Sequence, residues 1–425
     1  MTVGFFLRNK GICSINTSNV LDANPGIGGS EYEILCISYL LSLRKNNIDI
    51  ILYVEEDGFF PDMKCKVVKD LENCVNSCLN DNVEILIIDY KHHEKEIINK
   101  TENNLKYFIW AHNFILYKDL QYFSSKKNIV RIVHVGKESL DLYRDHKSFN
   151  KSIFIYNGIP VKELNFYLEK FKLNKARENK VVYLGSLVPV KGFHLIARTW
   201  KNVLKKIPDA QLYVIGNGKL YDRNSKLGTY EIAEETYENE FIGFVTDENK
   251  NILPSVHFLG ALGIEKNDVL KDCKVGVPNP SGNTETFGIS ALEMQLMGCE
   301  IVTIKCPGFI DTVNHSKFLY KNKRQLESYL IKALKQSTIN DNYTDIHNYI
   351  KENFSFENIL VRWEFELSNY KENLNVNLDL KNNFHLKRIK EILRITKVIL
   401  PFMNIIPPLE LFWNFKKKFA KLFKK

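Results

Sequence analysis

Two series of short apolar runs, separated by stretches of helix length, organise this chain of 425 residues. The runs of the first series lie at 3–7, 48–54, 83–88, 107–110, 129–135 and 153–156, and those of the second at 181–185, 211–216, 256–260, 274–280 and 300–304. Alternation of β-rich runs with helical segments is typical of an α/β fold with parallel sheets. Between the two series, Asn157-Gly158 is a turn dipeptide and Pro160 suits a helix start. The sequence therefore predicts two domains, 1–157 and 158–353, each built on its own parallel sheet.

Residues 280–298, which read P-S-G-N-T-E-T-F-G-I-S-A-L-E-M-Q-L-M-G, join a turn-rich segment to an apolar helical run. We expect Thr286, Phe287 and Gly288 to open this helix, so that their backbone N–H groups and the positive end of the helix dipole face an anion. Glu285 and Glu293 are eight residues apart, roughly 12 Å along a helix, so the two carboxylates would not hold one atom. They suit the two ends of an elongated ligand such as a sugar nucleotide. Because Glu293 lies among apolar residues, its carboxylate needs a partner, for which ribose hydroxyls are suitable.

Several glycine and polar positions follow the expected strands, at the edge where ligand sites form in parallel sheets. Gly28 and Gly29 precede a predicted helix and let the backbone approach a ligand, while Ser30 would cap that helix. His112 follows the fourth strand in W-A-H-N-F, and Lys191 lies at a loop-to-helix junction where it would hold phosphate. Each of these positions also has a simpler interpretation. The glycine loop could be a tight turn with an N-cap, His112 a loop histidine bonded to backbone, and Lys191 an ordinary surface lysine.

Positive charge is concentrated at the end of the chain. Residues 384–425 hold eleven Lys or Arg against two Glu, so this segment accounts for the whole formal net charge of +9. A neutral body with a basic tail argues against a general nucleic-acid binder. No two of the eight cysteines have C-x-x-C spacing, and the first residues do not read as a secretory signal, which favours a reducing cytoplasm.

The last part of the chain shows amphipathic patterns. Residues 354–366 predict one amphipathic helix, and the composition beyond residue 370 changes to Asn, Leu and Lys, as in a linker. Within 374–425, apolar side chains recur at helical spacing among basic ones, at Leu386, Ile389, Leu393, Thr396 and Leu400, and again at Phe412, Phe415, Phe419 and Leu422. Three prolines interrupt this region and disfavour a helix that spans a membrane. We expect residues 384–425 to bind an anionic membrane surface, with packing against the body or another subunit as the alternative.

Taken together, these features resemble the retaining nucleotide-sugar glycosyltransferases of family 4, which have the GT-B architecture. The motifs that carry the resemblance are G-G-S-E at 28–31, A-H-N at 111–113, N-G-I-P at 157–160, G-S-L-V-P-V-K-G at 185–192, V-I-G-N-G at 214–218 and the E-x7-E at 285–293. Their order and spacing agree over roughly residues 1–370. The resemblance implies two facing Rossmann-like domains with parallel sheets, an active site between them, and a helix at 354–373 that crosses back to the first domain. Residues 374–425 remain as a basic amphipathic tail.

The resemblance also implies roles for the second domain. Glu293 would bind the ribose of a nucleotide diphosphate sugar, and Glu285 would lie near the transferring sugar. Lys191 and the backbone amides of 286–288 would hold the diphosphate.

From the first domain, His112 and the loop of Gly28 and Gly29 would face the donor sugar and phosphates. The loop after Gly216 would contact the base, mostly through its backbone. Family members usually carry an arginine where this chain has Ser186. This departure removes one of the two cations expected at the diphosphate.

The function that follows is transfer of a hexose from a nucleotide diphosphate sugar to a lipid-linked or saccharide acceptor. The expected setting is biosynthesis of a cell-surface polysaccharide of the lipopolysaccharide O-antigen or capsule type, peripheral on the inner face of the cell membrane. The proposed site has no D-x-D motif, so no metal or other cofactor is expected there, and Lys191 with the helix N-terminus would do the metal's work.

Retention through a glycosyl-enzyme needs two carboxyl groups about 5–5.5 Å apart, which the E-x7-E spacing does not offer. A displacement on the same face of the sugar suits these residues better. Two alternatives stay open. One is a nucleotide-sugar epimerase or hydrolase on the same fold, and the other is a non-catalytic partner that binds a sugar nucleotide or stabilises a related transferase. Ser186 is the best support for the second alternative.

Overall fold

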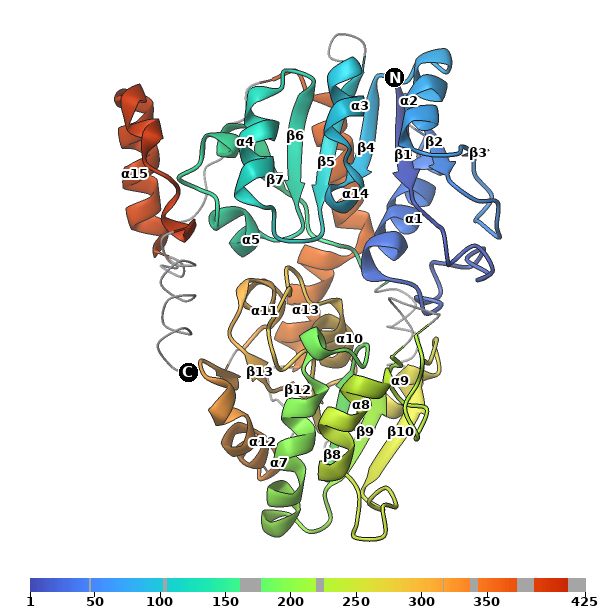
Figure 1. Ribbon diagram of the computed structural model, residues 1–425, viewed down its shortest axis with the longest axis vertical. Helices are drawn as coiled ribbons and strands as arrows, with labels where there is room; N and C mark the ends of the chain where they lie inside the picture. The colour runs from blue at the N-terminus through green and yellow to red at the C-terminus, as the bar shows by residue number, and fades with distance from the viewer. Residues whose placement is uncertain are drawn as a thin grey trace.

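The computed structural model describes residues 1–45, 47–101, 105–160, 177–218, 225–315, 317–336, 343–372 and 386–411. Two Rossmann-like domains face each other, one above the other in Figure 1, and each contains a parallel sheet covered by helices on both faces. This is the α/β arrangement of the GT-B fold that the sequence predicts.

The first domain is built on a seven-stranded sheet of order β3-β2-β1-β4-β5-β6-β7. The strands are β1 (Thr2–Leu7), β2 (Asp49–Val54), β3 (Cys65–Val67), β4 (Ile85–Asp89), β5 (Lys106–Ala111), β6 (Ile129–His134) and β7 (Ser152–Phe154), and all neighbours are parallel. Successive residues such as Phe5 and Phe6 point to opposite faces and enter separate cores, as the pleat requires. Helix α1 (Gly29–Ser42) covers one face; α2 (Leu71–Asn80), α3 (Lys95–Lys100) and α4 (Tyr117–Ser125) cover the other. The short, partly exposed β3 has too few apolar residues to be predicted.

The second domain is built on a five-stranded sheet of order β10-β9-β8-β11-β12. Its strands are β8 (Lys180–Leu184), β9 (Gln211–Ile215), β10 (Val256–Gly260), β11 (Val275–Val277) and β12 (Glu300–Ile301). One face carries α7 (Phe193–Lys206), α8 (Glu235–Phe241) and α12 (Leu326–Leu334), and the other carries α9 (Lys266–Leu270) and α10 (Ile289–Leu296). The apolar run 300–304 is not one strand, because its second half forms β13 (Thr303–Ile304), which pairs with β14 (Leu319–Tyr320) in a separate ribbon.

Short elements complete the two domains. They are α5 (Lys137–Asp141), α11 (Pro307–Thr312) and the 3-10 turns η1 (Tyr90–His92), η2 (Lys147–Lys151), η3 (Pro189–Lys191), η4 (Ile242–Phe244) and η5 (Lys323–Gln325).

Strand order reverses once in each sheet, between β1 and β4 in the first and between β8 and β11 in the second. At such a point the loops that leave two neighbouring strands diverge to opposite faces and open a crevice for a ligand. The predicted site residues follow these four strands or their neighbours. The topology therefore directs both sets of loops to the space between the domains.

Two helices return the chain from the second domain to the first. α13 (Tyr343–Phe354) ends where an isolated bridge joins Ser355 to Ile159, and α14 (Phe356–Ser368) then runs along the first domain. Trp363 of α14 is fully buried, with its ring 4.8 Å from that of Trp110 and 6.3 Å from that of Phe5. The crossing helix expected at 354–373 is α14.

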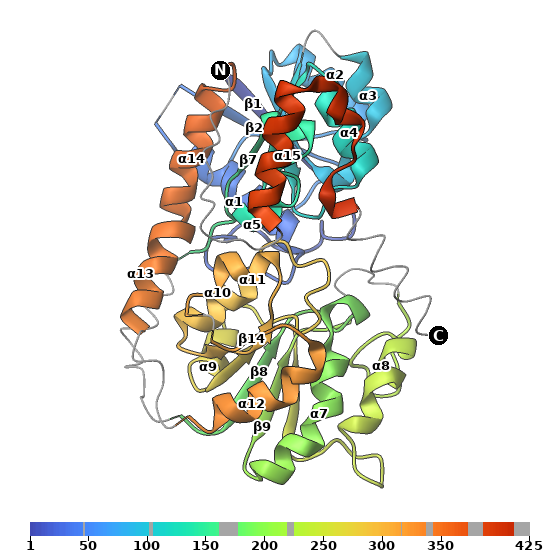
Figure 2. The same cartoon turned by 90° about the vertical axis from the view of Figure 1, so that its left-hand side faces the viewer.

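The tail forms α15 (Lys387–Ile399) and the 3-10 turn η7 (Pro401–Ile405), which lie against the flank of the first domain (Figure 2). Residues 374–385 and 412–425 of the predicted tail lie outside the described residues. Helical structure in the tail is as predicted, and the described part packs against the body, which was the alternative to membrane binding. Lys387, Lys390 and Lys397 are buried, because the body offers carboxylates and carbonyl oxygens to their ammonium groups. In the part of the chain that the structure describes, every helix is too short or too polar to cross a bilayer.

Candidate active site between the two domains

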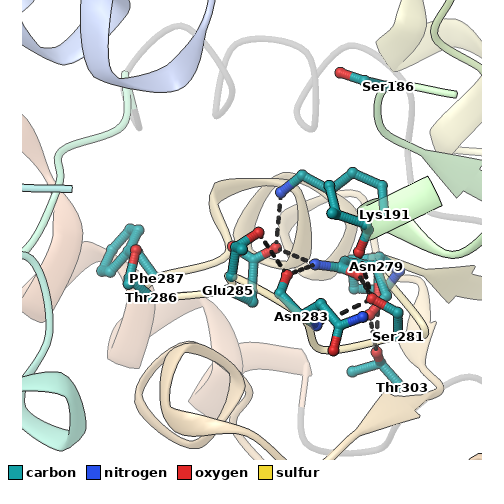
Figure 3. A network of polar contacts seen from close by, with 12 residues as sticks. Ser186, Lys191, Asn279, Ser281, Asn283, Glu285, Thr286, Phe287 and Thr303 are labelled. Atoms are coloured by element: carbon teal, nitrogen blue, oxygen red, sulfur yellow. Dashed lines mark hydrogen bonds and ion pairs between the residues drawn. The ribbon is translucent and has the colours of Figure 1, made fainter. Parts of the chain in front are cut away.

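The centre of the candidate site is a carboxylate held by a lysine and an asparagine. Glu285 Oε2 accepts hydrogen bonds from Lys191 Nζ at 3.0 Å and from Asn279 Nδ2 at 2.9 Å (Figure 3). Lys191 comes from η3 after β8, and the other two come from the loop after β11, so the strands at the reversal of order supply the cluster. The Glu285 side chain is 11% exposed and that of Lys191 is 22% exposed, which leaves the ammonium group reachable from the cleft.

The loop around this cluster is fixed by its own hydrogen bonds and by close backbone packing. Ser281 Oγ donates to Asn279 Oδ1 at 2.8 Å, and Thr303 Oγ1 donates to the carbonyl of Pro278 at 2.7 Å. Gly192 has a φ of 76°, and a Cβ there would lie 2.7 Å from that of Ser281. A larger residue at Gly192 would collide with Ser281. Glycine at this turn therefore allows the segment that carries Lys191 to pack against the 279–285 loop.

A second glutamate–lysine pair lies on α10. Lys266 Nζ, at the start of α9, lies 2.6 Å from Glu293 Oε1, and the two side chains are 8% and 18% exposed. The sequence indicated that Glu293 needs a partner but did not identify Lys266. No spacing rule connects a lysine 27 residues upstream to this helix, and only the packing of α9 beside α10 brings the two together.

In the first domain, His112 is oriented by a carboxylate that the sequence reading did not single out. Its Nδ1 lies 2.7 Å from Asp89 Oδ2, and both side chains are buried. Burial alone would raise the pKa of Asp89, but the hydrogen bond and the charge of His112 outweigh it and lower that pKa. The Nε2 of His112 has no hydrogen-bond partner among the described residues. Asp89 is the last residue of β4, directly after the apolar run 83–88, and this strand-end placement was the available signal.

Site residues of the first domain contact those of the second domain across the cleft. Thr286 Oγ1 donates to the backbone carbonyl of His112 at 2.6 Å. The α-carbon of Gly29 faces Ile289, because a Cβ built there would lie 3.9 Å from the Cδ1 of Ile289. The start of α1 and the start of α10 are thus close neighbours from opposite domains.

The helix after the 280s loop begins later than expected. α10 starts at Ile289, and its N-cap is Gly288, with a φ of 91°. Thr286, Phe287 and Gly288 therefore precede the helix and do not form its first turn. Phe287 is buried, with its ring 5.9 Å from that of Tyr156, so its side chain packs between the domains.

The glycine loop also differs in detail from its prediction. α1 begins at Gly29 with Gly28 as N-cap, and no side chain caps it, so the capping role of Ser30 is wrong. Ser30 Oγ donates instead to Glu31 Oε2 at 3.2 Å. A Cβ on Gly28 would lie 2.2 Å from that same oxygen, so the Glu31 side chain would have to move to accept a larger residue at Gly28.

Gly216 and Ser186 line the edge of the second sheet, away from the Glu285 cluster. Gly216 has a φ of 137°, and a Cβ there would lie 2.0 Å from the carbonyl oxygen of Gly185. Its N–H donates to the carbonyl of Gly260 at 2.7 Å, so glycines hold the ends of β8, β9 and β10 together. Ser186 lies apart from the hydrogen-bonded cluster in Figure 3.

The structure thus joins Lys191 to Glu285, His112 to Thr286 and the Gly29 loop to α10, and it pairs Glu293 with Lys266. Among the described residues, no three His, Cys, Asp or Glu side chains are arranged to hold a metal ion.

Residues 166–353 match the family model of glycosyl transferases group 1. The match covers most of the second domain. An uncharacterized glycosyltransferase of Haemophilus influenzae is 23% identical over 386 residues, which cover 85% of this chain and 98% of that protein. The chain resembles a glycosyltransferase along both domains.

Solved structures share the two-domain fold. HepE of Anabaena, in complex with UDP-glucose, is 13% identical with a TM-score of 0.58, over 87% of this chain and 99% of that one. WaaG, a glycosyltransferase involved in lipopolysaccharide biosynthesis, is 14% identical with a TM-score of 0.56, over 85% of this chain and 98% of that one. At these identities the structures support the GT-B fold.

Proposed function

We propose that this glycosyltransferase is a retaining enzyme that moves a hexose from a nucleotide diphosphate sugar to a lipid-linked or saccharide acceptor. The observation that carries the proposal is the cluster of Lys191, Glu285 and Asn279, which lies across the cleft from the pair of His112 and Asp89. The UDP-glucose bound by HepE and the role of WaaG in lipopolysaccharide biosynthesis support a donor of this class and a polysaccharide pathway of the O-antigen or capsule type.

The donor would bind along the second domain. Glu293 would accept hydrogen bonds from the ribose, and Lys266 would hold that carboxylate in place until the donor arrives. The ammonium of Lys191 and the backbone amides of 286–288 would hold the diphosphate. Because Ser186 replaces the usual arginine, Lys191 carries more of this work than in other members of the family.

The reaction breaks the bond between the anomeric carbon and the diphosphate. Negative charge then grows on the phosphate and positive character on the sugar, so a preorganised cation at the phosphate stabilises the transition state more than the ground state. Lys191 would supply that cation. Glu285, tied through Oε2 to Lys191 and Asn279, would orient the lysine and face the sugar.

His112 would position the donor sugar. Its Nδ1 is engaged by Asp89, which fixes the ring and leaves Nε2 for a sugar hydroxyl. The departing phosphate would accept the proton of the acceptor hydroxyl as the new bond forms on the same face of the sugar, which gives retention. We propose that the reaction needs no metal, since Glu285 and Glu293 are each paired with a lysine.

The proposed location is the cytoplasmic side of the cell membrane, peripherally bound. All eight cysteines are unpaired, as suits a reducing compartment. The basic tail and a lipid-linked acceptor both favour attachment to an anionic leaflet.

A donor screen tests the proposal. Nucleotide diphosphate sugars are compared by thermal shift, because a ligand that binds only the folded protein raises its melting temperature. The bound donor is then used in a transfer assay with and without EDTA, and the anomer of the product is read by NMR. We expect a shift with one donor, transfer that persists in EDTA, and retention.

Other outcomes identify the alternatives. Turnover of the donor without an acceptor would indicate an epimerase or hydrolase, and no shift with any donor would indicate a non-catalytic partner. Glu293→Ala tests the ribose role: unchanged donor affinity and turnover would show that assignment to be wrong.

A further inference from the structure

The tail helix docks on the first domain through its cations. Lys387, whose side chain is 1% exposed, pairs with Glu138 and with Asp141, the latter at 2.7 Å. Further along, Lys390 Nζ donates to the carbonyl of Leu142 at 2.9 Å, and Lys397 Nζ donates to that of Asp145 at 2.8 Å. Three lysines at helical spacing are thereby committed to the body of the protein.

The carboxylates of residues 386–411 are engaged in the same docking. Glu391 lies 2.9 Å from Arg144 of the body and also pairs with Arg394, and Glu410 pairs with Lys390 at 3.4 Å. These are the two acidic residues of the segment. Its outward face therefore presents no unpaired carboxylate.

That outward face is mostly apolar, with the exposed Arg388 one turn before Ile392 on the same side of the helix. We call its apolar part the apolar ridge, and it consists of Ile389, Ile392, Ile395, Val398, Ile399, Phe402 and Ile405. Their exposed fractions range from 45% for Ile395 to 87% for Ile405. Ile392 and Ile399 lie two helical turns apart, on the side of α15 opposite the docked lysines. Large apolar side chains exposed along α15 and in the turn η7 that follows it mark an interaction surface.

We propose that the apolar ridge inserts into the interfacial layer of an anionic lipid bilayer, and that the lysines of α15 clamp it to the body rather than contact lipid. The residues that follow the ridge in the chain indicate that it binds an anionic lipid surface. Residues 412–425 contain six lysines, five aromatic residues and no side-chain carboxylate. Six cations that follow the ridge in the sequence complement anionic headgroups, and a second copy of the chain, with the same positive charge, does not offer that complement.

This inference deepens the proposed function, because it names the surface that would hold the enzyme beside a lipid-linked acceptor. The inference also predicts how the protein is oriented on the membrane. α15 lies on the flank of the first domain in Figure 2, so the ridge would bring that domain to the membrane. The donor-binding domain would then lie farther from the bilayer, open to soluble nucleotide sugars.

Vesicle flotation of the full-length protein tests the inference. The vesicles are phosphatidylcholine alone or phosphatidylcholine with phosphatidylglycerol. The test variant is Ile392→Glu/Ile399→Glu/Ile405→Glu, and the matched control is Val361→Glu/Phe365→Glu, which places charge on exposed apolar residues of α14. We expect the ridge variant to lose at least about tenfold in partition to anionic vesicles, since carboxylates are disfavoured at an anionic apolar interface. The control should bind as the unaltered protein does.

A second variant, Lys416→Gln/Lys417→Gln/Lys418→Gln, separates the two contributions. It should weaken binding at low salt and reduce its salt dependence. Equal flotation of the ridge variant and the unaltered protein would overturn the inference, as would loss of binding in the α14 control. Light scattering that showed a dimer dissociated by the ridge variant, without vesicle binding, would assign the ridge to a second copy of the chain.

Thermal unfolding and transfer to a soluble acceptor are measured on every variant. Unchanged values with lost flotation would show that the ridge acts at the membrane and not on the fold. Flotation without transfer from any donor would leave the ridge supported and count against the proposed function alone.

Discussion

The two glutamates of the E-x7-E motif have separate lysine partners, and this separation defines their chemistry. Glu285 faces Lys191 at the edge of β8, while Glu293 faces Lys266 at the start of α9. An ammonium partner offsets part of the cost of placing a carboxylate among partly buried groups. Each pair also keeps a cation beside the cleft, where an anionic donor would bind.

Lys191 is the residue whose loss should cost most activity. Lys191→Met removes the cation proposed for the leaving diphosphate while it keeps the length of the side chain. We expect kcat to fall by about 10²–10³, as for removal of one preorganised group that stabilises transition-state charge. Steady-state kinetics with the donor found in the screen provide the measurement. Lys226→Met, at an 80% exposed lysine paired with Glu235, is the control and should leave kcat unchanged. An unaltered kcat for Lys191→Met would remove Lys191 from the mechanism.

The pair of Lys266 and Glu293 should be visible as a coupling energy. Lys266→Met or Glu293→Gln alone leaves a partly buried polar group without its partner and should lower the free energy of unfolding by about 2–4 kcal/mol. The double variant should lose less than the sum, by about 0.5–3 kcal/mol, because residues in direct contact are not additive. Urea denaturation of the unaltered protein, the two single variants and the double variant gives the double-mutant cycle. Strict additivity would mean that the two side chains do not interact in solution.

At the scale of elements, the sequence predicts helices and strands best where the residues of a single segment determine its secondary structure. Runs such as 107–110 and 211–216 became β5 and β9, because continuous apolar stretches can only be buried in a sheet covered on both faces. The start of α10 was misplaced, because the left-handed backbone of Gly288 is set by packing against Phe309 and not by the local pattern.

Partners from distant segments are beyond what such patterns reveal. Asp89 and His112 are joined only by the parallel pairing of β4 and β5, in which Asp89 lies beside Trp110. In the amphipathic tail, too, the sequence pattern does not reveal partners from distant segments. Its pattern predicts a helix with two faces, but the acidic residues of α5 decide which face turns inward.

The clamp between α15 and α5 should contribute strongly to stability. Lys387→Met would leave Glu138 and Asp141 buried without their cation, which costs about 3–5 kcal/mol of unfolding free energy or detaches the tail. Denaturation and limited proteolysis distinguish the two results, since a detached tail is cut early. Lys100→Met, at a 64% exposed lysine paired with Glu72, should leave the free energy of unfolding nearly unchanged, because exposed ion pairs are screened by solvent. If the two substitutions had the same small effect, the clamp would not exist in solution.

At the scale of the whole molecule, the domains are joined beside the cleft by a buried carboxyl group. Asp311 of α11 accepts a hydrogen bond from the N–H of Glu138 at 2.9 Å, and Tyr156 donates to it at 3.4 Å. The carboxyl groups of Glu138 and Asp141 and the ammonium of Lys387 complete its surroundings. Burial raises the pKa of Asp311 to about 8, so near neutral pH the carboxyl group is mostly protonated.

This pKa makes stability depend on pH in a defined direction. An aspartate of the unfolded chain titrates near ~3.9, so between about pH 4 and 8 the folded protein holds a proton that the unfolded chain has released. The contribution of Asp311 to stability therefore falls as pH rises through this window and is constant above it. Asp311→Asn removes the titration. From pH 5 to pH 8 the unaltered protein should lose about 2–4 kcal/mol of unfolding free energy relative to this variant.

Urea denaturation at the two pH values measures the difference, with Asp268→Asn, at a 56% exposed carboxylate, as the control that should follow the unaltered protein. Parallel pH dependence in Asp311→Asn and the unaltered protein would mean that Asp311 is ionised in the folded state. The contact between α11 and α5 would then join the domains through a charge rather than through a neutral hydrogen bond. In that case α11 would place one more buried negative charge beside α5, and the ammonium of Lys387 in the tail would have to balance three carboxylates instead of two.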